Sequence, residues 1–229
     1  MMGNMALTWK DDDELFELIR THLYTAVVGD VMDTLGFHHQ FLPQQIQPLR
    51  EDMFVAGRCM TVLEADVFDT DSAVKRPFGL MLEALDDLKK NEVYICTGGS
   101  LRYAFWGELM SKRAIHCGAA GAVVNGFSRD TRGILDLGFP TFSRGRYAQD
   151  QAPRGKVIDF RVPIEIEGVS ILPGDIVVGD LDGVCIIPRA KEEEVVCKAY
   201  EKATGEKTVA KAIDGGMSAT DAFDTYGIM

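Results

Sequence analysis

Hydrophobic positions along the chain recur at two different spacings, which separate the expected helices from the expected strands. Residues 11–23 begin with acidic residues and then carry apolar side chains at mostly helical spacing. Residues 25–35 predict a second short helix, which Gly36 ends. Residues 54–66 and 92–97 are instead apolar and rich in β-branched residues, a pattern that predicts strands. Helices and strands that alternate in this way are typical of an α/β fold.

The second half of the chain contains short, closely spaced strand patterns separated by turn residues. Such spacing predicts an antiparallel or mixed layer that follows a parallel βα part. A charged amphipathic pattern then predicts helices near the C-terminus, the last of which starts at Ser218 in a capping-box-like arrangement. The further elements expected are a helix at 77–89, strands at 138–144, 157–163 and 164–172, and helices at 189–202 and 205–213.

The stretch 98–133, GGSLRYAFWGELMSKRAIHCGAAGAVVNGFSRDTRG, combines these patterns in the order strand, loop, helix, strand, loop. It places the Gly107–Glu108 helix start and the Arg129–Asp130 pair at the mouths of neighbouring loops, where α/β sheets bind ligands. An arginine fits a carboxylate, a helix start offers free N–H groups, and an aspartate suits a hard cation. The stretch predicts an anionic-substrate, metal-assisted site. On spacing alone, an ion pair of Arg129 with an acid that ties two loops together has equal weight.

Composition narrows the classes of function. The chain has 229 residues and a net charge of −11, which argues against a nucleic-acid-binding face. Its five cysteines form no C-x-x-C pair, so we expect buried thiols in a reducing compartment rather than a zinc site or disulfides. The N-terminus has no signal-peptide pattern and no apolar run is long enough to cross a membrane, so a cytoplasmic location is expected.

Several common catalytic motifs are absent from the sequence. It contains no G-x-x-x-x-G-K-[ST], no G-x-G-x-x-G after a strand and no G-x-S-x-G. The four histidines do not have a metal-type spacing. These absences disfavour a common nucleotide site, an esterase and a zinc hydrolase, and leave Glu108 with Arg129 and Asp130.

Glu108, twenty residues and then Arg129-Asp130 form an acid-x20-Arg-Asp pattern. GAAGAVVNGFSRD, GFPTFSRG and VSILPGDIVVGDLDGVCIIPR accompany it. Together these motifs resemble a family with two kinds of member. One kind is the class II 4-hydroxy-4-methyl-2-oxoglutarate/4-carboxy-4-hydroxy-2-oxoadipate aldolases, and the other is the regulator of ribonuclease activity A (RraA). The resemblance runs from about Val28 to the C-terminal helices.

The resemblance implies a single domain over 1–229 with a swivelling β/β/α fold and flanking N- and C-terminal helices. The core would span about 24–190 and the C-terminal helices 190–229. It also implies a homo-oligomer, either a trimer or a dimer of trimers, with active sites at the subunit interfaces.

The resemblance also implies roles for individual residues. Asp130 would anchor a divalent cation, Mg²⁺ or Mn²⁺, and Arg129 would bind the keto-acid end of a 2-oxo acid substrate. Backbone N–H groups of Gly107, Glu108, Leu109 and Met110 would face the pyruvyl carboxylate. Glu108, where better-known aldolases carry an aspartate, would hold a metal-bound water.

A C-terminal acid of a neighbouring subunit separates competent aldolases from regulator-type members in this family. Glu206 is the expected residue, with Glu201 and Asp214 as alternatives.

The function so implied is a metal-dependent lyase that forms pyruvate by retro-aldol cleavage, by oxaloacetate decarboxylation or by both. The stabilised intermediate would be an enolate. Two alternatives stay open: an RraA-like protein that binds an RNA-degrading enzyme, and a related enzyme acting on a sugar acid.

Overall fold

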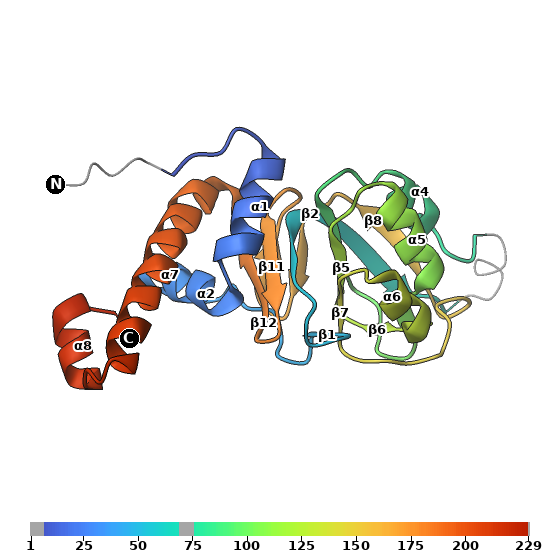
Figure 1. The fold of residues 1–229 in the computed structure, drawn as a ribbon. Helices are drawn as coiled ribbons and strands as arrows, with labels where there is room; N and C mark the ends of the chain where they lie inside the picture. The colour runs from blue at the N-terminus through green and yellow to red at the C-terminus, as the bar shows by residue number, and fades with distance from the viewer. Residues whose placement is uncertain (1–6, 69–75, 229) are drawn as a thin grey trace.

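The fold is organised by the long strand β2 (Val55–Asp66) in the computed structural model, which describes residues 7–68 and 76–228 (Figure 1). One edge of β2 pairs in parallel with β3 (Glu92–Thr97). The other edge pairs antiparallel with β11 (Ile176–Asp180) along its first residues and with β8 (Gly155–Phe160) along its last. β2 therefore belongs to both the parallel and the antiparallel part of one sheet.

Within the described residues the main sheet has eight strands in the order β1-β7-β5-β3-β2-β11-β12, with β8 on β2. β2, β3, β5 and β7 run parallel, whereas β11 and β12 form an antiparallel pair. This arrangement confirms the predicted α/β class and the mixed layer. The remaining strands are β1 (Gln47–Pro48), β5 (Gly121–Val124), β7 (Thr141–Ser143) and β12 (Gly183–Ile187), with β9 (Ile164–Ile166) paired to β10 (Val169–Ile171) and β4 (Ala104–Trp106) paired to β6 (Phe127–Ser128).

Helices gather at two ends of the molecule (Figure 1). Apolar side chains of α1, α2 and α7 pack against one face of β11 and β12 to form one core. Side chains on the other face of these two strands join α4, α5, α6 and the parallel strands in a second core. Asp11 caps the first helix, because its side chain accepts a hydrogen bond from the Glu14 N–H. The helices are α1 (Asp12–His22), α2 (Thr25–Thr34), α4 (Met81–Asp86), α5 (Glu108–His116), α6 (Thr131–Leu137), the 3₁₀ turn η1 (Arg189–Lys191), α7 (Glu192–Asp214) and α8 (Ala219–Tyr226).

Three predicted helices differ from the structure. The helix expected at 77–89 is confined to α4, because Gly79 adopts a φ of +60° and the next N–H, that of Leu80, donates to the carbonyl of Val157. The two helices expected at 189–202 and 205–213 form the single helix α7. It continues through Gly205, whose missing side chain leaves room for Ile228: a Cβ there would lie 2.5 Å from its Cδ1.

The cysteines are free in the described chain, as expected, and Cys59, Cys96 and Cys185 are buried. Burial raises the pKa of each of these three thiols, which keeps them protonated at neutral pH. Cys117 and Cys197 are half-buried.

Arg58 fastens the terminal helices to the sheet. Its guanidinium extends from β2 with only 12% of the side chain exposed, and pairs with Asp12 of α1 at 2.6 Å and with Glu192 of α7. The same group lies over the ring of Phe16, 5.6 Å from its centroid. One cation therefore holds helices from opposite ends of the chain.

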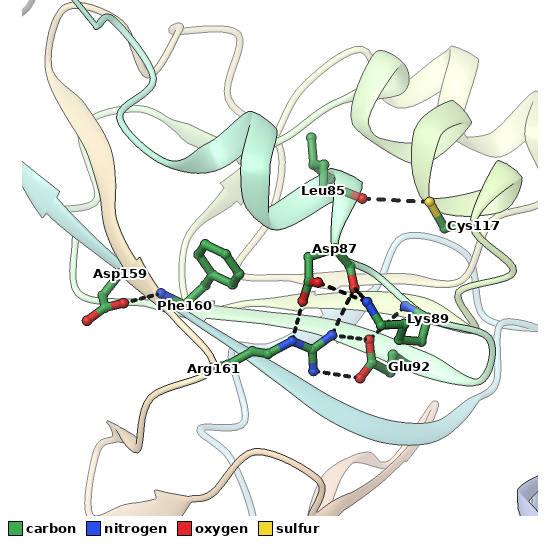
Figure 2. Close-up of polar contacts among 8 residues, drawn as sticks. All are labelled: Leu85, Asp87, Lys89, Glu92, Cys117, Asp159, Phe160 and Arg161. Atoms are coloured by element: carbon green, nitrogen blue, oxygen red, sulfur yellow. Dashed lines mark hydrogen bonds and ion pairs between the residues drawn. The ribbon is translucent and has the colours of Figure 1, made fainter.

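A second arginine ties β8 to the connection between α4 and β3 (Figure 2). Arg161, at a φ of +56°, forms a fork with Glu92 at 2.7 and 2.9 Å and also pairs with the carboxylate of Asp87. It donates in addition to the Asp87 carbonyl at 2.9 Å. Such two-point contacts of arginine fix orientation as well as distance.

Arg58→Met should lower the free energy of unfolding by about 2 kcal/mol, because it leaves two carboxylates without their shared cation. This loss of stability is smaller than that expected when a fully buried ion pair is broken, because Asp12 is partly exposed. Urea denaturation measures it. Lys10→Met, which removes an exposed pair with Glu14, is the control and should change stability by less than about 0.5 kcal/mol. Equal losses in the two variants would contradict the role given to Arg58.

Candidate active site

Two loops meet where α5 and α6 begin. Gly107 follows β4 and precedes α5, while Arg129 and Asp130 follow β6 and precede α6. β4 and β6 pair in parallel, so their carboxyl ends lie at the same edge. The Arg129 N–H donates to the carbonyl of Trp106 at 2.9 Å, which joins the two loops directly. The structure thus brings together the two predicted segments.

Asp130 lies against the start of α5. A Cβ at Gly107 would be only 2.9 Å from the carboxylate oxygen Oδ2 of Asp130, so glycine allows the close approach. Asp130 itself adopts left-handed φ and ψ angles of 53° and 33° and does not cap α6 with its side chain. This conformation is uncommon for a residue with a side chain.

Arg129 contacts acidic groups on both sides. Its Nε lies 3.6 Å from Asp130 and one terminal nitrogen lies 3.0 Å from Asp150, while 35% of its side chain is exposed. The structural ion pair weighed in the sequence analysis therefore exists. The Arg129 guanidinium has five N–H donors in a planar fork, so these two contacts leave other donors available to a ligand.

Glu108 points toward α6. Its carboxylate pairs with Lys112 at 2.5 Å, and a Cβ at Gly133 would lie 2.2 Å from its Oε2. Glu108 and Asp130 line the same surface hollow, to which Lys112 and Gly133 also contribute.

A cavity of about 450 Å³ lies beside the start of α5. Its apolar wall includes Trp106, and its polar groups include Arg113. Four of the five residues predicted to bind substrate line it, whereas Glu108 lines the adjoining hollow and Asp130 lines both. The four are Gly107, Leu109, Met110 and Arg129.

The start of α5 is suited to an anion. In the first backbone hydrogen bond of the helix, the Ser111 N–H donates to the Gly107 carbonyl at 3.1 Å. The N–H groups of Glu108, Leu109 and Met110 therefore have no acceptor within the helix. Free N–H groups and the positive end of the helix dipole favour a bound carboxylate here.

A divalent cation is compatible with the oxygen ligands at the hollow. Within residues 7–68 and 76–228, no group of three or more histidine, cysteine or acidic side chains could hold a metal ion. Asp130 and Glu108 nevertheless both contribute carboxylates to one hollow. Mg²⁺ is commonly held by one or two carboxylates, with water and substrate oxygens completing its shell. The two residues fit this pattern.

Glu206 lies apart from these residues in the same chain. It sits on α7, at the end of the molecule opposite α5 and α6 (Figure 1). Its carboxylate accepts a hydrogen bond from the Tyr24 hydroxyl and lies 3.6 Å from the amine of Lys202. Partial burial raises the pKa of Glu206. Its role in a neighbouring subunit's site stays a prediction.

A family model described as "RraA-like: Aldolase/RraA" matches residues 25–186. The chain belongs to the RraA-like family. This matched region contains both loops of the site and ends before α7, where Glu206 lies.

Relatives of this RraA-like chain agree with the match. A Halalkalibacterium halodurans protein, provisionally named a 4-hydroxy-4-methyl-2-oxoglutarate aldolase, is 32% identical over 87% of this chain and 89% of its own. A Thermus thermophilus protein named as the same aldolase is 30% identical over 58% of this chain and 75% of its own.

Solved structures share the fold. An uncharacterized protein from Pseudomonas syringae pv. tomato is 26% identical with a TM-score of 0.82, covering 97% of this chain and all of that one. Streptomyces coelicolor RraAS2 is 24% identical with a TM-score of 0.74, covering 88% and 98%, and supports the fold alone. Among the described residues, no helix is long and apolar enough to cross a membrane.

Asp150 is a site residue that the sequence did not reveal. It contacts Arg129 from the loop between β7 and β8, about twenty positions further along the chain. No motif surrounds it, and the lone aspartate between Gln149 and Gln151 resembles an ordinary surface acid. Only the return of the chain to β2 through β8 brings it to the site.

Gly133→Ala tests the position of Glu108. Alanine within a helix normally stabilises by about 0.5–1 kcal/mol relative to glycine. Here the new Cβ would displace the Glu108 carboxylate, so we expect a loss of about 1 kcal/mol instead, measured by urea denaturation. The same substitution in a Glu108→Ala background should be stabilising. A gain in both backgrounds would mean that Glu108 does not lie against α6.

Proposed function

We propose that this protein is a divalent-metal-dependent lyase that cleaves a 2-oxo dicarboxylic acid to pyruvate by retro-aldol reaction, by decarboxylation of oxaloacetate or by both. The observation that carries the proposal is the convergence of Arg129, Asp130 and the free N–H groups of α5 beside one cavity. The aldolase names of its relatives support the same class of reaction.

The cavity suits a small acid with two anionic ends. The N–H groups at the start of α5 and the guanidinium of Arg129 are positioned for a 2-oxo carboxylate. Arg113 lines the same cavity and pairs with Asp86 at 2.8 Å, so a second cation is available for the distal carboxylate. The apolar wall, which includes Trp106, would limit the access of water to the carbon that becomes the enolate.

Asp130 would hold the cation, Mg²⁺ or Mn²⁺, with Glu108 reaching it through water. When bound, such an ion withdraws electrons from the keto group and lowers the energy of an enolate. Arg129 and the α5 N–H groups stabilise the same developing negative charge through fixed donors. Asp150 holds Arg129 in place on the side away from Asp130.

The reaction needs a base for the retro-aldol direction. The substrate hydroxyl loses its proton, the adjacent carbon–carbon bond breaks, and its electron pair enters the pyruvate enolate. Glu108, which lines the adjoining hollow with Lys112 beside it, would accept that proton through a water. Decarboxylation of oxaloacetate instead breaks the bond from C3 to the C4 carboxylate and releases CO2. It leaves the same enolate, which takes a proton at carbon to give pyruvate.

Assembly would complete the site. We propose a cytoplasmic trimer or dimer of trimers in which Glu206 of one subunit reaches the Arg129 site of its neighbour. Because α7, which carries Glu206, lies at the end of the molecule away from α5, any contribution of Glu206 to the site would come from a neighbouring subunit. Residues 1–229 would act as one domain, since β2 is shared by both halves of the sheet.

Pyruvate release is the direct test. Purified protein given 4-hydroxy-4-methyl-2-oxoglutarate or oxaloacetate should release pyruvate with Mg²⁺ and lose that activity with EDTA, as followed by a coupled dehydrogenase assay. Release from oxaloacetate alone would restrict the proposal to decarboxylation. No metal-dependent release from either acid would refute it in favour of a regulator of an RNA-degrading enzyme or a sugar-acid enzyme.

Arg129→Ala and Asp130→Ala should each lower kcat/KM at least about 100-fold, the size expected when a transition-state contact is removed. Thermal melting should show an intact fold. Arg50→Ala, which removes an exposed arginine paired with Asp52, is the control and should retain wild-type kinetics. Wild-type activity in either site variant would place the site elsewhere.

A further inference from the structure

Glu64 is a buried acid close to the site, and the mechanism above does not use it. It lies on β2 with 2% of its surface exposed, where the pairing with β8 shifts register between Leu63 and Glu64. Burial raises the pKa of this carboxyl to about 7. Burial of an ionisable carboxyl group costs folding stability, so a functional reason for an acid at this position is expected.

Hydrogen-bonding groups surround the Glu64 carboxylate. Among the described residues, no arginine or lysine side chain contacts it. From β3, the Cys96 thiol donates to its Oε2 at 3.7 Å, and the buried Tyr94 hydroxyl lies nearby. Tyr103 lies beside it and donates to Asp66 on the same strand, which also pairs with Arg102.

The strongest contact of Glu64 leads to the active site. The Gln151 side-chain amide, in a residue only 4% exposed, donates to Glu64 Oε1 at 2.7 Å. The Gln151 carbonyl accepts from the N–H groups of Arg154 and Gly155 at 2.6 and 2.9 Å. Gln151 is therefore held at both its side chain and its backbone.

Gln151 directly follows Asp150, and both line the cavity. Asp150 reaches Arg129 at 3.0 Å. A path of two polar contacts and one peptide bond thus runs from the interior of the sheet to the proposed substrate-binding guanidinium. Contacts of this kind set the geometry of a site because small displacements cost large factors in rate.

We propose that Glu64 is a positioning residue, which through Gln151 fixes the Asp150 carboxylate and hence the orientation of Arg129. This inference deepens the proposed lyase function and rests on it for its kinetic consequences. The ionised form of Glu64 accepts the Gln151 hydrogen bond more strongly than the neutral acid does, so the site is best ordered when Glu64 is charged.

Removal of the acceptor gives the first test. Glu64→Leu fills a similar volume without a charge, and should lower kcat/KM at least tenfold while the protein remains folded. Gln151→Leu should give a similar loss, and the double variant should lose little more than either single one, because both changes break the same path.

Thr61→Val is the matched control. Thr61 is also a buried β2 residue, and its hydroxyl donates to the Val162 carbonyl at 2.6 Å, away from the cavity. This variant should lower the melting temperature yet keep wild-type kinetics. Wild-type kinetics in Glu64→Leu, or additive losses in the double variant, would overturn the proposal.

The pH dependence separates positioning from a merely structural role. In the wild type, kcat/KM should rise as pH increases through about 7, the value to which burial raises the pKa of Glu64. Glu64→Gln should lack this rise. The folded-state pKa lies above the ordinary value of 4.5, so the folded protein binds more protons between the two values. The wild type should therefore lose stability relative to Glu64→Gln as pH increases across that window, as measured by thermal melting.

A crystal structure of Glu64→Leu decides the inference independently of turnover. If the wild type releases no pyruvate from either acid, the proposed lyase function fails by itself. In that case, displacement of Asp150 from Arg129 in the variant would still support the positioning role. An unchanged Asp150–Arg129 pair would overturn that role whether or not the wild type is active.

Discussion

The pairing of β2 with three other strands is the constraint on which the rest of the structure depends. β3 occupies one edge, and β11 and β8 divide the other between them. β3 leads into the segment that ends in Gly107, while β8 completes the loop that carries Asp150. Because β3 and β8 both pair with this one strand, the segments that follow β3 and precede β8 inherit their relative positions from it. The Arg58 and Arg161 ion pairs then fasten helices and connections to this frame.

The sequence predicted the elements whose apolar spacing reflects burial. α1, α2, β2 and β3 lie within a residue or two of their expected bounds, since each buries one periodic face or a continuous apolar run. The helix expected at 77–89 is shorter because residues 78–80 pair with β8, a partner about eighty positions away. α7 continues through Gly205 because Ile228 packs there. Both departures arise from tertiary contacts that local spacing does not encode.

The residues of the candidate site also fall into a group that the sequence predicted and a group that it did not. Gly107–Met110 and Arg129–Asp130 were predictable because each directly follows a strand, and parallel strands bring their carboxyl ends together. Asp150, Gln151 and Glu64 carry no comparable pattern. Their contacts depend on the register of β8 on β2 and on burial, and burial is also what gives Glu64 its raised pKa. Sequence reasoning thus found the residues that line the candidate site and missed those that contact them from behind.

The left-handed backbone of Asp130 has a consequence for protein engineering. A residue with a Cβ in this conformation costs about 1–2 kcal/mol relative to the right-handed region, a penalty that glycine avoids and asparagine reduces. A thermostabilisation campaign guided by backbone preference alone would therefore select glycine or asparagine at this position. Either choice would discard the carboxylate that lies beside Gly107. Position 130 is thus a point where a gain in melting temperature and the retention of the carboxylate proposed to hold the cation select opposite residues.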